Sequence, residues 1–258
     1  MSRCTFPSLS AGMWLTCILL LTICTQTWAQ LSRDRDELLN WCLDAKYHKK
    51  KPGPESKLYR QCIPWKDRSC CTENTSQEIH RNIYNFDLDH CKQETGRQMS
   101  EACRQHFRQD LCFYECEPNI GPWAQKDDKK IRKERFINVP LCSADCDSWW
   151  KACKNDYTCV DNWSLKFKFI KGVNHCPNNT KCETFEEVFK TAKNFCEKVW
   201  DHSWKYTESG GCMRIWFNGS AGNPNRRVAE VYVDQLLSSS SCKCCSLLLI
   251  LLLLVLVF

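Results

Sequence analysis

The stretch RQDLCFYECEPNIGPW, residues 108–123, combines side chains that could bind a flat polar ligand with side chains that form covalent cross-links. Cys112 and Cys116 are four residues apart, and so are Asp110 and Tyr114. On an α-helix, residues i and i+4 share one face, and residues two apart lie about 200° apart around the axis. The spacing therefore predicts a helix fixed along one stripe by its cysteines, with a carboxylate and an aromatic ring on nearly the opposite stripe.

Motifs for catalysis and for metal binding are absent from the sequence. It contains no G-x-S-x-G, no H-E-x-x-H and no phosphate-binding loop, and its His residues are scattered. No C-x-x-C pair occurs between Cys42 and Cys212, which disfavours a zinc site. The formal net charge is only +6, and basic clusters such as Lys49–Lys51 are typical of solvated faces rather than of nucleic-acid sites. We therefore expect a binding protein rather than an enzyme, with no cofactor and no metal.

Helical patterns predominate among the elements that must position these side chains. They cover Glu37–Lys46, Glu101–Glu115, the segment LCSADCDSWWKACK that Pro140 opens, and Thr184–Trp200. Pro118 and Gly121 follow the second pattern, as expected after the end of a helix. Short apolar pieces such as Met213–Phe217 fit strands. The expected fold class is α+β: a single disulfide-rich globular domain, dominated by helices, with short β-strands.

Both ends of the chain carry apolar segments that direct proteins to the cell surface. Residues 1–29 have the pattern of a secretory signal peptide. Residues 238–258 combine serines, a short spacer and the apolar tail Leu247–Phe258, which spans about 18 Å as a helix against a hydrocarbon core of roughly 30 Å. This pattern predicts a glycosylphosphatidylinositol (GPI) anchor. The alternatives are secretion after loss of the tail and a tail-anchored form. The candidate attachment residues are Ser238, Ser239, Ser240 and Ser241.

The cysteine count also indicates an extracellular protein. Of the 22 Cys residues, those between Cys42 and Cys212 number sixteen, which allows eight disulfides in an oxidising compartment. The length of residues 30–237 suits one ectodomain. Sequons for N-glycosylation occur at Asn74, Asn162, Asn178 and Asn218.

Longer motifs resemble one known family across essentially all of residues 30–237. They are KPGPESKLYRQCIPW, CCTENTSQE, CFYECEPNIGPW, RKERFINVPLC, YTCVDNW and GNPNRRVA, together with the sixteen cysteines. These motifs resemble the folate receptor family. Its riboflavin-binding and egg-surface sperm-receptor branches share the scaffold, so the ligand needs an argument of its own.

The resemblance implies a pocket for the pterin ring of a folate. In the family, one Asp, two Arg and a Ser hold the ring, and a Tyr and a Trp sandwich its faces. A carboxylate can accept hydrogen bonds from the 2-amino and ring N–H groups, while guanidinium groups donate to the 4-oxo group and the ring nitrogens. The alternative is that Asp110 lies on a surface helix and pairs with Arg132 or Arg135. The residues that match the family's positions are Asp110, Arg132, Arg135, Ser203, Tyr114 and Trp200.

The outer half of the implied pocket departs from the family pattern. Ile131 and Phe169 replace two Trp residues, Ser164-Leu165-Lys166-Phe167 replaces His-Lys-Gly-Trp, and Lys129 replaces Gln. We expect that pterin recognition is kept and that recognition of the glutamate tail is rewritten. A glycan on Asn162 would lie at the pocket mouth. The residues expected in this outer half are Tyr84, Phe86, Lys129, Ile131, Ser164, Leu165, Phe167 and Phe169.

The resemblance also implies how the half-cystines pair. The implied pairs are Cys42–Cys70, Cys62–Cys112, Cys71–Cys116, Cys91–Cys182, Cys103–Cys153, Cys142–Cys212, Cys146–Cys196 and Cys159–Cys176.

The expected function is that of a GPI-anchored receptor on the cell surface that binds folate or reduced folates and carries them into the cell by endocytosis. The alternative is a protein-interaction receptor of the sperm–egg type, with weak or no folate binding. That branch lacks the pterin-site carboxylate that this chain has as Asp110. The expected partners are a small-molecule folate and the membrane, with a protein on another cell under the alternative, and no nucleic acid.

Overall fold

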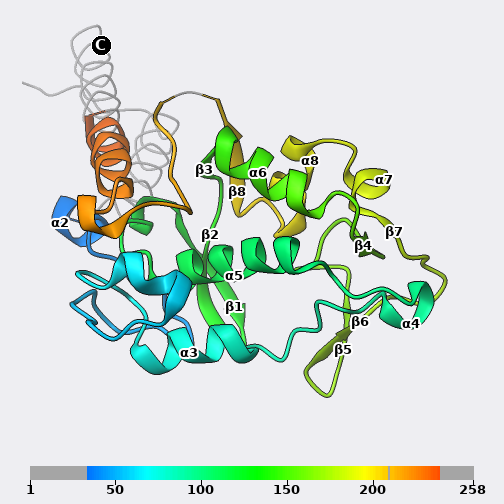
Figure 1. The fold of residues 1–258 in the computed structure, drawn as a ribbon. Coiled ribbons are helices and arrows are strands. Elements are labelled where there is room, and N and C mark those ends of the chain that lie inside the picture. Colours follow the sequence, from blue (N-terminus) through cyan, green and yellow to red (C-terminus); the bar gives the residue numbers. More distant parts are fainter. Residues whose placement is uncertain (1–33, 209, 239–258) are drawn as a thin grey trace, which may run out of the picture. The chain divides into compact units, whose positions relative to one another are not determined.

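The computed structural model describes residues 34–208 and 210–238 (Figure 1). By its internal contacts the chain divides into two compact units. Leu38–Glu230 form the larger unit, which contains every residue expected to bind the ligand. The described residues of the other unit are 34–37 and 231–238, and within it Arg35 Nε donates a 2.8 Å hydrogen bond to Asp234 Oδ1.

Helices make up most of the regular structure, as the sequence predicts. The α-helices are α2 (Arg35–Leu38), α3 (Glu73–Arg81), α4 (Lys92–Thr95), α5 (Glu101–Cys116), α6 (Ser143–Cys153), α7 (Phe185–Phe189) and α8 (Ala192–Val199), and residues 225–238 are also helical. The 3-10 turns are η1 (Arg60–Trp65), η2 (Gly121–Trp123) and η3 (Gly219–Ala221).

The strands are short and form four separate pairs. Pairs β1–β2, β4–β7 and β5–β6 are antiparallel, and β3–β8 is parallel. The strands are β1 (Ala124–Lys129), β2 (Arg132–Phe136), β3 (Val139–Cys142), β4 (Tyr157–Thr158), β5 (Lys168–Ile170), β6 (Val173–His175), β7 (Glu183–Thr184) and β8 (Trp204–Thr207). The expected α+β class with short strands is confirmed.

Disulfides hold these small elements together. The eight disulfides are those implied by the resemblance: Cys42–Cys70, Cys62–Cys112, Cys71–Cys116, Cys91–Cys182, Cys103–Cys153, Cys142–Cys212, Cys146–Cys196 and Cys159–Cys176. The helices are short and the strand pairs are separate, so cross-links that restrict the unfolded chain add to the stability that the core supplies.

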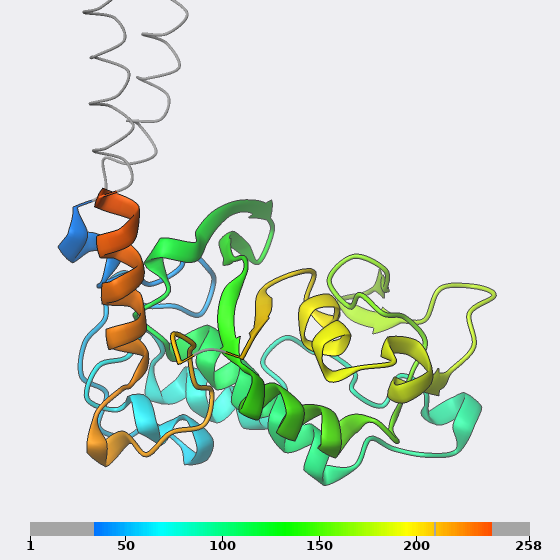
Figure 2. The ribbon, with the colours of Figure 1, turned by 90° about the horizontal axis from the view of Figure 1, so that it is seen from above.

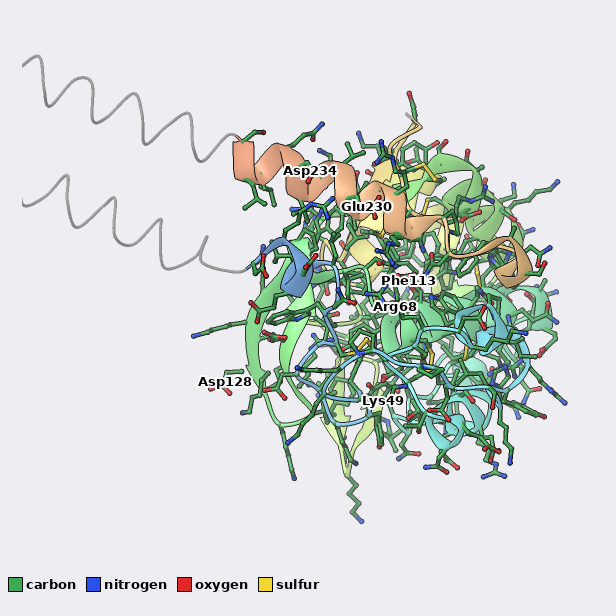
Figure 3. The ribbon with its side chains drawn as sticks, turned by 90° about the vertical axis from the view of Figure 1, so that its left-hand side faces the viewer. Lys49, Arg68, Phe113, Asp128, Glu230 and Asp234 are labelled. Carbon is green, nitrogen blue, oxygen red and sulfur yellow. A yellow bond between two sulfur atoms is a disulfide. The ribbon has the colours of Figure 1, made fainter. Side chains whose placement is uncertain are left out.

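Aromatic side chains fill the core between the helices. The rings of Phe107 and Trp163 stack with their centroids 4.7 Å apart, and Trp149 meets Phe107 edge-on at 5.1 Å. Figure 3 shows Phe113 in the interior, whereas Asp128 lies at the outer edge of the β1–β2 hairpin. Helix α5 crosses this core between α6 and α3 (Figure 1), and α8 lies beside β8 in Figures 1 and 2.

The predicted helix Glu37–Lys46 is wrong, because α2 ends at Leu38. Beyond it the backbone of Trp41 donates to the carbonyl of Pro118, and Trp41 forms a parallel bridge with Asn119. Pairing with distant backbone thus satisfies the groups that a continued helix would have used internally.

The predicted helix Thr184–Trp200 is two helices, α7 and α8. Lys190 ends α7 with a φ of 68°, a left-handed conformation that no helix interior allows. Thr191 then caps α8, because its side chain accepts a hydrogen bond from the backbone N–H of Asn194.

The segment after Pro140 also differs from its prediction. Val139–Cys142 forms strand β3 beside β8, and α6 begins only at Ser143. Met213–Phe217 forms no strand, and Met213 contributes only an isolated bridge to Leu141.

Within the described ranges, no helix is long and apolar enough to cross a membrane. The expected signal peptide, residues 1–29, lies outside these ranges, as do Ser239, Ser240, Ser241 and the apolar tail of the expected anchor signal.

Candidate functional site

Helix α5 carries the acid and the ring that the sequence singled out. The Ser100 side chain caps its start by accepting a hydrogen bond from the Cys103 backbone N–H, and the helix ends at Cys116. Disulfides tie Cys112 to Cys62 of η1 and Cys116 to Cys71. The predicted helix Glu101–Glu115 is therefore confirmed to within one residue, and the cross-links fix its orientation.

A cavity of about 610 Å³ lies along the opposite side of α5. This volume is within the range of small-molecule sites. Of the fourteen residues expected in the pocket, eleven line the cavity: Asp110, Tyr114, Arg132, Trp200, Ser203, Tyr84, Phe86, Lys129, Ile131, Ser164 and Phe169. Those that do not are Arg135, Leu165 and Phe167.

Asp110 places a carboxyl group in a buried position at the cavity wall. Its residue is 6% exposed, and its Oδ1 accepts a 2.8 Å hydrogen bond from the indole N–H of Trp204. Burial raises the pKa of the Asp110 carboxyl to about 7, although the indoles of Trp204 and Trp200 act to lower it. The structure therefore contradicts the alternative, in which Asp110 lies on the surface and pairs with an arginine.

Tyr114 stands beside Arg132 at the same end of the cavity. Burial raises the pKa of the Tyr114 hydroxyl. Burial lowers the pKa of Arg132, but the neighbouring Tyr114 and Asp127 raise it overall, and Arg132 Nε donates to Asp127 Oδ2 at 2.5 Å. On the backbone side, His48 Nε2 lies 2.9 Å from the Tyr114 carbonyl oxygen. The Tyr114 ring itself contacts the rings of His48 and Phe136, at centroid distances of 5.3 and 5.8 Å.

Arg135 takes a different position from the one that the resemblance implies. Its residue is 7% exposed and does not line the cavity. Its guanidinium donates to Asp201 Oδ2 at 2.8 Å, to the Trp200 carbonyl at 2.8 Å and to Ser203 Oγ at 3.1 Å. Arg135 therefore supports the Trp200–Ser203 loop through these hydrogen bonds.

Two residues expected in the outer pocket lie elsewhere. Phe167 is buried, 7% exposed, and packs edge-on against Phe86 and His90 at centroid distances of 5.6 and 4.8 Å. Leu165 is 61% exposed outside the cavity lining. Phe167 and Leu165 are only two residues apart, yet one is buried and the other exposed, so their positions in the sequence could not place them.

Tyr84 connects the cavity to a buried acid. Its hydroxyl donates a short hydrogen bond to Glu115 Oε1, and the other carboxyl oxygen of Glu115 lies 3.4 Å from His48 Nδ1. Burial raises the pKa of both Tyr84 and Glu115. These contacts orient the Tyr84 ring at the cavity wall.

Sequence reasoning missed several residues of the site. Trp204 holds Asp110, Glu115 holds Tyr84, and Trp163 lines the cavity while stacking on Phe86 at 5.4 Å. Trp204 directly follows Ser203 in the sequence, so its polar ring N–H next to an implied ligand residue was an available signal.

Metal-binding groups in the described ranges offer no site. The two clusters with suitable spacing consist of His90 with Cys91 and Cys159, and of Cys91 with Cys176 and Cys182. All of these cysteines form disulfides, so none can supply a thiolate ligand.

Comparison with known proteins relates the chain to binding proteins. The model of the Folate receptor family matches residues 41–214. Over 227 residues the chain is 44% identical to folate receptor gamma of Homo sapiens, covering 85% of this chain and 91% of that protein. It is 46% identical to folate receptor alpha of Homo sapiens over 205 residues, 77% of this chain and 78% of that one. Riboflavin-binding protein of Dromaius novaehollandiae is 31% identical over 182 residues, 69% and 71% of the two chains.

Proposed function

Because the chain belongs to the folate receptor family, a family of binding proteins and not of enzymes, we propose that it binds folates with the pterin ring inside the cavity along α5. One observation carries the proposal: the buried carboxyl group of Asp110 opens onto a cavity that is also lined by the rings of Tyr114 and Trp200. An acid in so apolar a place needs hydrogen-bond donors to be stable as an anion. The 2-amino and ring N–H groups of a pterin supply such donors.

Each wall of the cavity then has a role. The Asp110 carboxylate accepts from the donor edge of the ring, and Tyr114 and Trp200 cover its faces, where aromatic contact adds dispersion and excludes water. Arg132 donates to the 4-oxo group, and Ser203 adds a further polar contact. We assign Arg135 a positioning role, because it holds Trp200 and Ser203 through its hydrogen bonds to that loop.

The decisive experiment is a titration of the full-length protein, purified from expressing cells, with folic acid, pteroic acid, 5-methyltetrahydrofolate and riboflavin, followed by Trp fluorescence. We expect the pterins to bind and riboflavin not to compete. Asp110→Asn keeps the shape but offers one acceptor oxygen, and Asp110→Ala offers none. An unpaired buried donor costs about 1–3 kcal/mol, so either variant should bind about fivefold or more weakly.

Asp128→Asn is the matched control, because Asp128 is an acid on the exposed edge of the β1–β2 hairpin (Figure 3). It should leave the pterin affinity unchanged. Suppose the Asp110 variants fold, reach the surface and bind pterins as tightly as the parent. The protein-interaction receptor would then become the preferred function.

We further propose that the chain reaches the cell surface through its signal peptide, is held there by a GPI anchor at one of residues 238–241, and carries its ligand inward by endocytosis. The sequence patterns of the two ends support this, as described above. Phosphatidylinositol-specific phospholipase C should release the protein from cells. Retention after deacylation of the anchor would point instead to a tail-anchored form.

The four sequons are proposed as glycosylation sites. Asn74, Asn178 and Asn218 are exposed, which suits a bulky polar glycan. Asn162 is half-buried, and its side chain donates to Asp201 Oδ1 and accepts from the Leu165 backbone N–H.

A further inference from the structure

Six basic side chains are among the residues that line the cavity along α5. Among the described residues that line it, Asp110 is the single carboxylic acid. A pterin that pairs with Asp110 would leave the basic side chains without an anion in the cavity itself. These side chains are Arg81, Arg104, Arg108, Lys129, Lys130 and Arg132.

The arginines on α3 and α5 are neutralised from outside the cavity. Each forms an ion pair with an acid that is not part of the lining, so their net field in the cavity is small. The pairs are Arg81–Glu78 at 2.9 Å, Arg104–Asp89 at 2.7 Å and Arg108–Glu101 at 2.6 Å.

The lysines at the turn of the β1–β2 hairpin are not neutralised in this way. Lys129 reaches Asp127 only at 3.8 Å and shares it with Arg132, which is closer at 2.5 Å. Burial, and next the charge of Arg132, lower the pKa of Lys129. Lys130 is exposed and has no ion-pair partner within 4.0 Å among residues 34–208 and 210–238.

A third lysine lies at the turn of the neighbouring hairpin, β5–β6. Lys171 occupies that turn with a φ of 51°, directly before Gly172, which lines the cavity. Lys171 is exposed, and within the described part of the chain no ion pair engages it. Lys129 and Lys130 line the cavity, and Lys171 adjoins its lining at Gly172, so its mouth offers three incompletely neutralised cations. Ile131 and Phe169 add exposed apolar surface to the same lining.

We propose that this lysine mouth, defined as Lys129, Lys130 and Lys171, selects folates whose tail carries several glutamyl residues. The proposal rests on the proposed function, because a pterin held at Asp110 directs the tail outward. One glutamyl group brings two carboxylates, fewer than the lysines at the mouth. Each further glutamyl residue adds one carboxylate, so the complementarity of charge improves as the chain grows.

The size of the effect follows from the exposure of these lysines. An exposed ion pair contributes roughly 1.4- to 5-fold in affinity, and salt screens it over a Debye length of about 8–10 Å. We expect affinity at low salt to rise by about this factor for each of the first added carboxylates, and the rise to flatten in high salt.

The experiment titrates the full-length protein with pteroic acid, folic acid, and the triglutamyl and pentaglutamyl forms of folic acid at low and at high salt. In the double variant Lys129→Gln/Lys130→Gln, the ratio of triglutamyl to monoglutamyl affinity should fall towards one. Lys151→Gln is the matched control: Lys151 is an exposed lysine on α6, and neither it nor its neighbours in sequence line the cavity. In this control variant, the ratio of triglutamyl to monoglutamyl affinity should equal that of the parent.

Equal affinity of the parent for the monoglutamyl and triglutamyl forms at low salt would overturn the inference, as would an unchanged ratio in the double variant. The two proposals fail differently. Binding of pteroic and folic acid without any dependence on tail length contradicts only the lysine mouth. Absence of binding to every pterin contradicts the proposed function itself.

Discussion

The indole N–H of Trp204 donates a 2.8 Å hydrogen bond to Oδ1 of Asp110, and both residues are buried. Strand β8 thereby orients the acid of helix α5 before any ligand arrives. Because burial raises the pKa of Asp110 to about 7, the protonation of this one group depends on the ordinary range of extracellular and endosomal pH.

Pterin binding should weaken as the pH falls below 7. The donor edge of the ring needs the carboxylate, so a protonated Asp110 must lose its proton before it can pair. The linkage amounts to at most a tenfold loss of affinity per pH unit. Fluorescence titrations with pteroic acid between pH 5 and pH 8 measure it, and a flat profile would exclude Asp110 as the pterin acceptor.

Trp204→Phe should move this pH dependence to higher pH. The indole hydrogen bond lowers the pKa of Asp110, so its loss raises that pKa above about 7. The midpoint of the affinity profile should rise accordingly. Trp149→Phe is the control, because Trp149 is a fully buried Trp whose Nε1 has no hydrogen-bond partner in the described structure. Equal midpoints in both variants would contradict the assigned role of Trp204.

Without ligand, Asp110 should make the folded protein less stable as the pH rises. Its folded-state pKa of about 7 exceeds the ordinary value of 3.8 that the carboxyl has in the unfolded chain, so between these values the folded state binds more protons. The free energy of unfolding therefore falls with increasing pH through this window, by at most a few kcal/mol from this group. Urea unfolding measures the free energy of unfolding of the parent and of Asp110→Asn. The difference between the two values should grow from pH 5 to pH 8. A constant difference would count against the raised pKa.

Arg135→Gln should reduce both stability and pterin affinity. Asp201 and the carbonyl of Trp200 would lose their guanidinium donor, at a cost of about 1–3 kcal/mol in the free energy of unfolding. Arg226→Gln, at an exposed ion pair with Glu230 and outside the cavity lining, should cost less than about 1 kcal/mol. Thermal unfolding and ligand titration of the two variants test the difference. If the two variants are equally stable, the support of the 200–203 loop does not depend on Arg135.

Two neighbouring disulfides should differ in their contribution to stability. Cys91–Cys182 spans 91 residues of sequence and Cys159–Cys176 spans 17. In the loop-entropy description, removal of the longer link by paired Cys→Ala substitution costs about 1.5 kcal/mol more than removal of the shorter one. Chemical unfolding of the two double variants measures this. The reverse order would show that native contacts, and not chain entropy, determine the contributions.

Local patterns in the sequence predicted α5 well and its neighbours less well. Helix α5 has a capping residue at Ser100 and Pro118 beyond its end, so both boundaries are visible locally. The break between α7 and α8 is not visible, because Lys190 adopts its left-handed conformation without a glycine or proline nearby. The segment after Leu38 pairs with backbone about 80 residues away, and no local signal reveals such a partner.

The residues of the site, like the elements of the fold, could be predicted from the sequence only in part. Asp110 and Tyr114 follow from their spacing on one helix, and the resemblance adds Trp200 and Ser203, which do line the cavity. Arg135 could contact the ligand or could support the 200–203 loop. Which of the two it does depends on the side of strand β2 that meets this loop. The cationic side chains of α3 and the two hairpin turns come together only through tertiary packing, so no sequence window contains them.

Helix α5 carries the acid of the site and also Cys103, Cys112 and Cys116, whose disulfides reach α6, η1 and Cys71. We therefore expect the cavity to take its shape only after these bonds have formed. A newly synthesised chain gains ligand affinity together with its oxidised state, and a ligand supplied in the secretory pathway would shift the folding equilibrium by mass action. Retention of a labelled pterin can thus serve as an assay of completed oxidative folding, and reductants should release the ligand without any change of pH.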